Sequence, residues 1–519
     1  MNIPFPDDER VVELSSHYGF GVSAADVTEY AAAIAVSLSS FDHVERLHQR
    51  IAPTPPSRAY QLPDDRSRGW AVTTDITEIA EGQLHGRTTA VKDNVAVAGV
   101  PMENGSAAVA GFIPSRDATV VRRLLNAGAT ITGKSVCEDL CFSGASFTSW
   151  REPVCNPWDR TRDAGGSSSG SAALVAGGEV DLAVGGDQGG SIRIPASFCG
   201  IVGHKPTHGL VPYTGAFPIE STIDHLGPMT RTVADTALML GVLAGPDGFD
   251  PRQPSHLQPV DYVAELSKPV AGLRIGVLRE GFASPGSMVG VDNIVRAVVE
   301  RLASRGLPTE EVSVPWHLDA KHVWDVIATE GTTFQMLDGN GYGMNSWGLY
   351  DDELIAHFAR ERLERAASLS TTVKVTAMTG RYSFETGCGT YYAKARNLAY
   401  EVRAAYDAAL VNHDVLVMPT TPFTARELPV VADLSVAEYL ECALSMLTNT
   451  AAFDVTGHPA ISVPAGLLDG LPVGMMIVGR RFDDATVLRV AHAVEQLAGE
   501  FPRPTVDLNV AAWSASSDR

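Results

Sequence analysis

Hydrophobic residues follow two different spacings along this chain. In the N-terminal part, Val27, Tyr30 and Ile34 lie three or four positions apart, which is the spacing of one face of a helix. Ser23 precedes this run, so we expect the helix to begin with Ser23 as its N-cap. Four prolines between residues 51 and 69 then interrupt the pattern. They predict a linker there.

From residue 86 onward, short apolar runs alternate with helical stretches. Runs typical of strands occupy residues 88–91, 130–136, 273–281, 414–420, 460–466 and 472–479, and helical periodicity fills several of the intervals between them. This alternation predicts an α/β fold, with a mixed sheet covered by helices on both faces. Residues 316–405 lack clear strands and are rich in aromatic residues. We expect them to form a mostly helical insertion that caps the sheet.

These patterns divide the chain into four regions. Residues 1–75 form a helical extension and linker, and residues 76–315 form most of the core. Residues 316–405 are the helical cap, and residues 406–519 complete the core sheet. Because a short helical extension buries little surface alone, we expect it to pack on the main body or to join two copies into a homodimer.

Charge and composition narrow the class of protein. The 519 residues carry 40 Lys and Arg against 61 Asp and Glu, a formal charge of −21, which disfavours nucleic acid and anionic membranes as partners. No apolar run approaches the roughly 18 residues of a membrane span, and the acidic start lacks a signal-peptide pattern. Six cysteines are too sparse for a disulfide scaffold. We expect a cytoplasmic protein that acts on a small molecule.

The segment from Ala164 to Thr207 carries the candidate chemistry. Glycine and serine alternate in two clusters, 165–171 and 185–191, and such clusters let backbone N–H groups converge on a ligand. No lysine follows either cluster where a phosphate loop needs one. Two nucleophiles remain open: Ser168, in a formal G-x-S-x-G elbow, and Ser191, in a serine–lysine arrangement. A metal site is not expected, because Pro206 interrupts a helix between His204 and His208 and no third ligand is evident.

Several long motifs resemble one family. GGSSSGSAALVAGG, GGDQGGSIRIPASFCGIVGHKPT and HLGPMTRTVAD, with AVKDN upstream, are similar to the amidase signature family. The resemblance extends from about residue 86 to TGHPAISVPAG and LPVGMMIVGR. Within the family, the chain is most similar to bacterial amidases of the nitrile-degradation type, which also carry DQGGSIR and an N-terminal helical extension. The resemblance implies the amidase signature fold.

The resemblance also implies a catalytic triad. By motif, Ser191 matches the acylated nucleophile, Ser167 the bridging serine with a cis peptide bond, and Lys92 the base. The backbone N–H groups of Gln188, Gly189, Gly190 and Ser191 would form the oxyanion hole. The implied reaction needs neither a metal nor an organic cofactor.

Other site residues follow from the same comparison. Phe142, Trp324 and Leu447 resemble positions that line the acyl pocket, and Ser168 is expected to donate hydrogen bonds inside the site. We expect Asp187 and Arg193 to pair and shape the loop. Such a pocket favours aromatic or branched aliphatic amides, cleaved to the acid and ammonia. The alternatives are hydrolysis of carbamates, anilides or hydrazides, and a glutaminase subunit of a tRNA-dependent amidotransferase.

Overall fold

The computed structural model describes residues 3–341 and 348–505, and the chain divides into two units, Met1–Pro56 and Ser57–Arg519. Parts of the expected cap (342–347) and of the expected C-terminal segment (506–519) lie outside the described residues. Among the described helices, none has the length and apolar character needed to cross a lipid bilayer.

The first unit is a pair of helices, α1 (Asp8–Tyr18) and α2 (Val27–His48). Asp7 caps α1 by accepting a hydrogen bond from the Arg10 N–H, and Gly19 ends the helix in the left-handed conformation. The expected Ser23 cap is wrong: α2 begins at Val27, and the Ser23 hydroxyl donates instead to the Asp26 carboxylate at 2.7 Å. Residues 24–26 form a turn, in which the Asp26 N–H donates to the Ser23 carbonyl oxygen at 3.0 Å, so the helix begins only after that turn.

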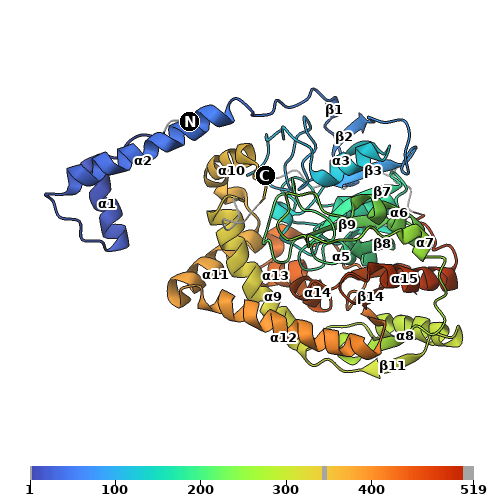
Figure 1. Cartoon of the computed structure of the whole chain (residues 1–519). Coiled ribbons are helices and arrows are strands. Elements are labelled where there is room, and N and C mark those ends of the chain that lie inside the picture. The colour runs from blue at the N-terminus through green and yellow to red at the C-terminus, as the bar shows by residue number, and fades with distance from the viewer. Residues whose placement is uncertain (1–2, 342–347, 506–519) are drawn as a thin grey trace. The chain divides into compact units, whose positions relative to one another are not determined.

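The second unit is built on one mixed sheet between helices (Figure 1). Within the described residues, the strand order is β1-β2-β4-β3-β7-β9-β8-β13-β14-β12-β10-β11. The strands of this sheet are β1 (Tyr60–Gln61), β2 (Trp70–Ile76), β3 (Thr88–Lys92), β4 (Thr130–Ser135), β7 (Leu182–Asp187), β8 (Val202–Lys205), β9 (His225–Thr230), β10 (Ile275–Leu278), β11 (Thr309–Val312), β12 (Val415–Pro419), β13 (Ala460–Leu468) and β14 (Leu471–Gly479). A separate hairpin joins β5 (Cys155–Asn156) to β6 (Asp159–Asp163).

Pairing of β8 with β13 joins the two halves of the sheet. These strands run antiparallel with Ala460 opposite Lys205, so residues more than 250 positions apart become neighbours. Strand β3 is parallel to both β4 and β7, and β10 is parallel to both β11 and β12. The central strands are buried along their length, as in β7 and β14. Burial on both faces explains why their sequences are continuous apolar runs.

Helices cover this sheet on both faces. On one face lie α3 (Thr119–Asn126), α6 (Val233–Leu243), α7 (Tyr262–Glu265), α8 (Val289–Ser304) and α15 (Asp484–Ala498); α4 (Ser169–Ala176) and α5 (Arg193–Cys199) pack together against the sheet as well. Between β11 and β12 the chain forms α9 (Trp316–Thr332), a π-helical turn η3 (Thr333–Asp338), α10 (Asp352–Glu364), α11 (Thr371–Gly387) and α12 (Thr390–Asn412). After β12 come α13 (Val436–Leu444) and α14 (Ala452–Thr456). The predicted α/β fold class is confirmed.

Candidate active site

The site forms where two parallel strands end side by side. Strand β3 ends at Lys92 and strand β7 ends at Asp187, with Val91 opposite Val184. The carboxyl ends of parallel strands meet at one edge of a sheet, which is the usual place for a site in α/β proteins. Lys92 and the loop that follows Asp187 therefore share this edge.

Lys92 is fully buried and contacts one of the predicted serines. Its Nζ lies 2.8 Å from Ser167 Oγ and 3.2 Å from the Gly186 carbonyl oxygen. Ser167 is also fully buried, and the Gly166–Ser167 peptide bond is cis. Position 166 has no room for a side chain, because a Cβ there would lie 2.7 Å from the Ala145 carbonyl oxygen. The glycine before Ser167 is therefore required by the close packing of this loop.

Ser191 lies at the end of the loop after β7 and borders a small cavity. It is 7% exposed, and its carbonyl oxygen accepts a hydrogen bond from the Ser168 N–H at 3.2 Å, which joins the two glycine–serine clusters. The N–H groups of Gln188, Gly189, Gly190 and Ser191 donate to no other group within residues 3–341 and 348–505. Free N–H groups are a precondition for an oxyanion hole, whose donors must be available to the substrate oxygen.

The residues lining the cavity are mostly apolar. They include the three predicted acyl-pocket residues, Phe142, Trp324 and Leu447; the rest of the lining is Cys141, Ser143, Gln188, Gly189, Ser191, Ile219, Ile223, Ala328 and Leu444. The free volume is about 20 Å³, close to the space that one water molecule occupies. An aryl acyl group therefore enters only if some of these side chains move.

Ser168 and Gln188, two of the predicted site residues, make hydrogen bonds to other parts of the protein. The Ser168 hydroxyl is fully buried and donates to the Gly186 carbonyl oxygen at 3.1 Å, so it holds β7. The Gln188 side-chain nitrogen donates to the Tyr213 hydroxyl at 3.0 Å. The side-chain oxygen of Gln188, Oε1, is buried without a partner among the described residues. Both residues help to fix the loop that carries Ser191.

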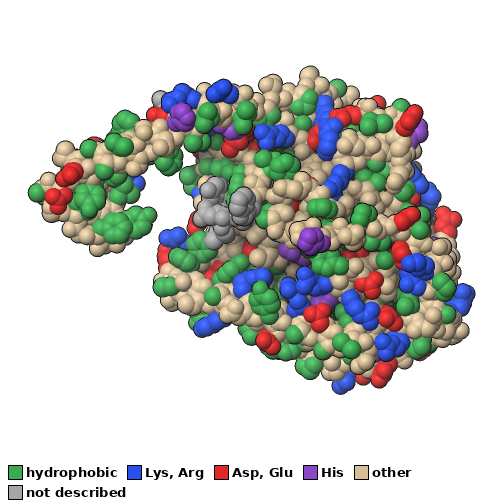
Figure 2. Space-filling model, in the orientation of Figure 1, with side chains coloured by type: hydrophobic (Ala, Val, Ile, Leu, Met, Phe, Trp, Pro, Cys, Tyr) green, Lys and Arg blue, Asp and Glu red, His purple; other side chains and the backbone are tan. Residues whose placement is uncertain are grey.

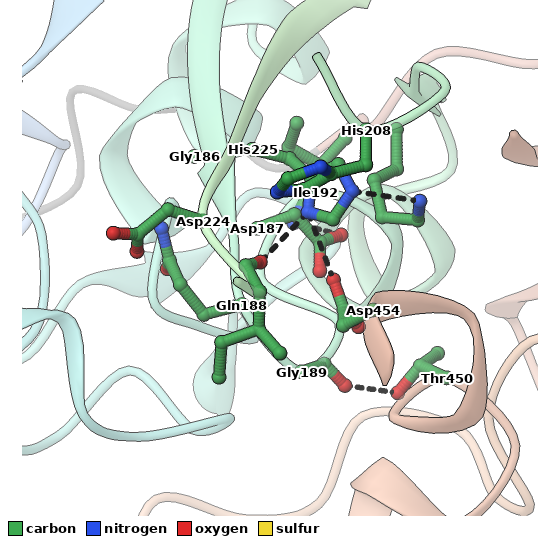
Figure 3. Close-up of polar contacts among 12 residues, drawn as sticks. Gly186, Asp187, Gln188, Gly189, Ile192, His208, Asp224, His225, Thr450 and Asp454 are labelled. Carbon is green, nitrogen blue, oxygen red and sulfur yellow. Dashed lines mark hydrogen bonds and ion pairs between the residues drawn. The ribbon is translucent and has the colours of Figure 1, made fainter. Parts of the chain in front are cut away.

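Asp187 and Arg193 form the expected pair, and they are part of a larger buried network. The Arg193 guanidinium donates to both Asp187 oxygens at 3.0 Å, to Asp454 at 2.7 Å and to the Thr450 carbonyl oxygen at 2.9 Å. Burial alone would raise the pKa of Asp187, but the Arg193 charge outweighs it and holds that pKa below its usual range. For Asp454, burial and repulsion from Asp187 outweigh Arg193, and the pKa rises. Figure 3 shows the labelled Asp187 and Asp454 in this region.

The structure adds residues that the sequence did not single out. Thr450 and Asp454 come from the segment around α14, far from the motifs in sequence, and no local signal marks them. Glu138 is buried beside the first cluster, where Ser169 donates to it at 2.8 Å. Burial raises the pKa of Glu138 to about 8, against the hydrogen bonds that it accepts.

Cys141 is a further unexpected neighbour of the site. Cys141 ends a three-residue turn, η1 (Asp139–Cys141), with a positive φ of 61°. Burial would raise the pKa of its thiol, but a hydrogen bond with Cys137 and the charge of Lys92 bring it to about 7. Cys141 is also part of the cavity lining.

Comparison with known proteins now adds to this geometry. The family model described as Amidase matches residues 58–488. The chain is 58% identical to an enantioselective amidase from Rhodococcus rhodochrous, over 96% of this chain and 97% of that one. The chain belongs to the amidase family.

Solved structures of other amidase-family proteins have the same fold. A glutamyl-tRNA(Gln) amidotransferase subunit from Thermotoga maritima matches with a TM-score of 0.69 and 28% identity, over 90% of this chain and 93% of that one. Peptide amidase from Stenotrophomonas maltophilia matches with a TM-score of 0.66 and 30% identity, over 82% of this chain and 85% of that one. This amidase is an enzyme, a hydrolase of amide carbon–nitrogen bonds.

Proposed function

We propose that this amidase hydrolyses simple carboxylic acid amides to the acid and ammonia through an acyl-enzyme on Ser191. The observation that carries the proposal is the contact of 2.8 Å between Lys92 Nζ and Ser167 Oγ, at the same sheet edge as the nucleophile loop. A serine hydroxyl needs a base to remove its proton, and a lysine amine can take that role in a serine–lysine arrangement. Ser167 is the relay between that amine and Ser191.

The reaction has two steps, acylation of Ser191 and hydrolysis of the resulting ester. Ser191 Oγ attacks the amide carbonyl carbon while its proton passes through Ser167 to Lys92, and the N–H groups of residues 188–191 stabilise the oxyanion. The carbon–nitrogen bond then breaks, the proton returns to the leaving nitrogen, and ammonia departs. Water attacks the Ser191 ester by the reverse relay and releases the acid.

The acyl group is proposed to be aromatic or branched aliphatic. Phe142, Trp324 and Leu447 supply an apolar lining, and apolar surfaces retain apolar acyl groups. The similarity to the Rhodococcus enantioselective amidase supports amide hydrolysis as the reaction. The leaving group is ammonia in this proposal, and carbamates, anilides, hydrazides and glutamine are the competing substrates in the test.

The test measures product release from a panel of substrates. Hydrolysis of benzamide, propionamide and glutamine is measured as released ammonia. Hydrolysis of a phenyl carbamate and of an anilide is measured as the released amine. The proteins compared are wild type, Ser191→Ala and the matched variant Ser106→Ala. Ser106 is a buried serine outside the cavity lining. Ammonia from benzamide that disappears only in Ser191→Ala supports the proposal. Activity on glutamine or carbamate alone would overturn it.

We propose further that the enzyme is a cytoplasmic homodimer, joined through the N-terminal region predicted as residues 1–75. The α1–α2 unit exposes large apolar side chains, among them Phe20, Val36 and Ile51, each at least 70% exposed. Figure 2 shows hydrophobic side chains on the surface of this N-terminal unit. Exposed apolar patches mark interaction surfaces. The six cysteines are free thiols, which suits a reducing compartment.

Sedimentation tests the dimer with a matched pair of variants. Val36 in α2 and Val289 in the second unit are both 72% exposed. The proposal is supported if wild type and Val289→Arg sediment with the mass of two chains and Val36→Arg sediments with the mass of one chain. A single-chain mass for wild type would reject it.

A further inference from the structure

Two side chains from distant parts of the chain donate hydrogen bonds to carbonyl groups of residues 188–191, which we call the nucleophile loop. Trp324 Nε1, on α9, donates to the Gln188 carbonyl oxygen at 2.6 Å. Thr450 Oγ1, just before α14, donates to the Gly189 carbonyl oxygen at 2.6 Å, and Figure 3 shows this contact. These carbonyls belong to the two consecutive peptide groups whose nitrogens are those of Gly189 and Gly190.

A carbonyl that is held also fixes the N–H of the same peptide group. Both of these peptide bonds are trans, since the cis bond of the described chain is the one before Ser167. In a planar trans peptide, the C=O and N–H bonds point in opposite directions. The Gly189 N–H therefore points away from Trp324, and the Gly190 N–H points away from Thr450. Neither N–H has an acceptor among the described residues.

Gly189 and Gly190 allow these close contacts because neither carries a side chain. A Cβ at Gly189 would lie 2.6 Å from the Trp324 ring, and a Cβ at Gly190 would lie 2.4 Å from Thr450 Oγ1. Gly190 also has a φ of 143°, which side chains rarely adopt. Any side chain at either position would push the donor away from the carbonyl that it holds.

The threonine is itself held by the buried ion network. Arg193 donates to the Thr450 carbonyl oxygen at 2.9 Å, and Asp187 accepts from the Ile192 N–H at 3.0 Å and so closes the loop. Thr450 Oγ1 lies 3.2 Å from a second acceptor, the Leu447 carbonyl oxygen, so its single proton serves the nearer Gly189 oxygen. The hydroxyl position is therefore determined by protein groups alone.

We propose that Thr450 and Trp324 are positioning residues of the oxyanion hole. Thr450 holds the Gly189 carbonyl and so orients the Gly190 N–H toward the oxygen of the substrate carbonyl. Trp324 holds the Gln188 carbonyl and so orients the Gly189 N–H toward the same oxygen. The proposal rests on the acyl-enzyme function assigned to Ser191. Thr450 is the cleaner case, because it lies outside the cavity lining, whereas Trp324 is part of it.

The decisive variant is Thr450→Val, which keeps the shape of the side chain and removes the hydroxyl. Loss of one oxyanion donor costs about 10² to 10³ in kcat, and a misaimed donor loses part of that. We expect kcat to fall at least about 10-fold, with KM within about threefold of wild type, because the N–H groups act mainly on the transition state. Thr450→Ser retains the hydroxyl, and it should recover kcat to within about threefold.

Binding of two inhibitors separates positioning from general damage. Benzeneboronic acid forms a tetrahedral adduct with an active serine, whereas benzoate resembles the product. We expect Thr450→Val to weaken the boronate by about the same factor as kcat and to leave benzoate unchanged. The matched variant is Thr230→Val, because Thr230 is a buried threonine whose hydroxyl donates to a carbonyl oxygen at 2.8 Å at the other end of the sheet.

Three outcomes decide the proposal. A loss of kcat and boronate affinity in Thr450→Val, rescued by Thr450→Ser and absent in Thr230→Val, supports it. Equal activity of Thr450→Val and wild type, or equal weakening of boronate and benzoate, overturns it. If Thr450→Val does not fold, Trp324→Phe, which lacks the indole N–H, is judged by the same boronate-to-benzoate ratio. Full activity of Ser191→Ala would instead reject the acyl-enzyme itself.

Discussion

Replacing Arg193 by methionine removes a buried cation from between two buried carboxyl groups. Arg193 is fully buried, and its guanidinium makes hydrogen bonds to Asp187, Asp454 and the Thr450 carbonyl oxygen. Methionine fills a similar length with an unbranched apolar chain, so the change acts mainly on charge and hydrogen bonding. The variant leaves Asp187 without its main counter-charge in a region closed to water.

The expected loss can be estimated from general values. Removing one partner of a buried ion pair costs about 3–5 kcal/mol, against a total stability of roughly 5–15 kcal/mol for a folded domain. The unfolding entropy is about 2 cal/mol/K per residue, so a unit of over 400 residues loses about 1 °C of midpoint per kcal/mol. We therefore expect the unfolding midpoint of Arg193→Met to fall by about 3–5 °C.

Thermal unfolding followed by circular dichroism, with activity measured on the same samples, tests this estimate. The matched variant is Arg381→Met, which removes an exposed arginine 2.7 Å from Glu385 and should leave the midpoint unchanged, because solvent screens that pair. Adding Asp187→Asn to Arg193→Met should restore part of the midpoint by removing the unpaired charge. A midpoint of Arg193→Met equal to wild type would refute the reasoning.

Three further changes have definite expected results. Gly190→Ala should lower kcat at least about 100-fold, because its Cβ meets Thr450 Oγ1 at 2.4 Å and displaces an oxyanion donor. Glu138→Gln should remove a pH dependence of stability. The folded chain keeps the Glu138 proton up to about pH 8, whereas the unfolded chain releases it near pH 4.5. Wild type should therefore lose stability relative to the variant as the pH rises between these values. Leu447→Ala should raise kcat/KM for bulky over small acyl groups by at least about 10-fold, because it enlarges the cavity.

Each of these has its own check. For Gly190→Ala the control is Gly178→Ala, at another positive φ but with nothing within 4 Å of the new Cβ; equal activity losses would point to backbone strain alone. For Glu138→Gln, unfolding midpoints are compared from pH 5 to pH 8, and parallel curves for the two proteins would contradict the protonated carboxyl. For Leu447→Ala, an unchanged ratio of benzamide to propionamide hydrolysis would remove this residue from the acyl pocket.

Local sequence pattern was enough to determine the type and order of many elements. The runs at 88–91, 130–136 and 472–479 became β3, β4 and β14. The signal is clearest for β14, because a strand buried on both faces is apolar along its length. The polar start of the chain concealed α1, whose helix depends on the Asp7 cap and on contacts with α2. The pairing of β8 with β13 could not be deduced either, since no local signal relates strands so far apart.

For the site, the sequence by itself supplied the candidates Lys92, Ser167 and Ser191, because the motifs around them are long and specific. Only the tertiary structure decided what holds those residues. Thr450 and Trp324 reach the nucleophile loop from segments more than 130 residues away, and their contacts depend on how α9 and the segment around α14 pack together. Hydrogen-bond partners of this kind are set by three-dimensional packing and leave no periodic pattern in the chain.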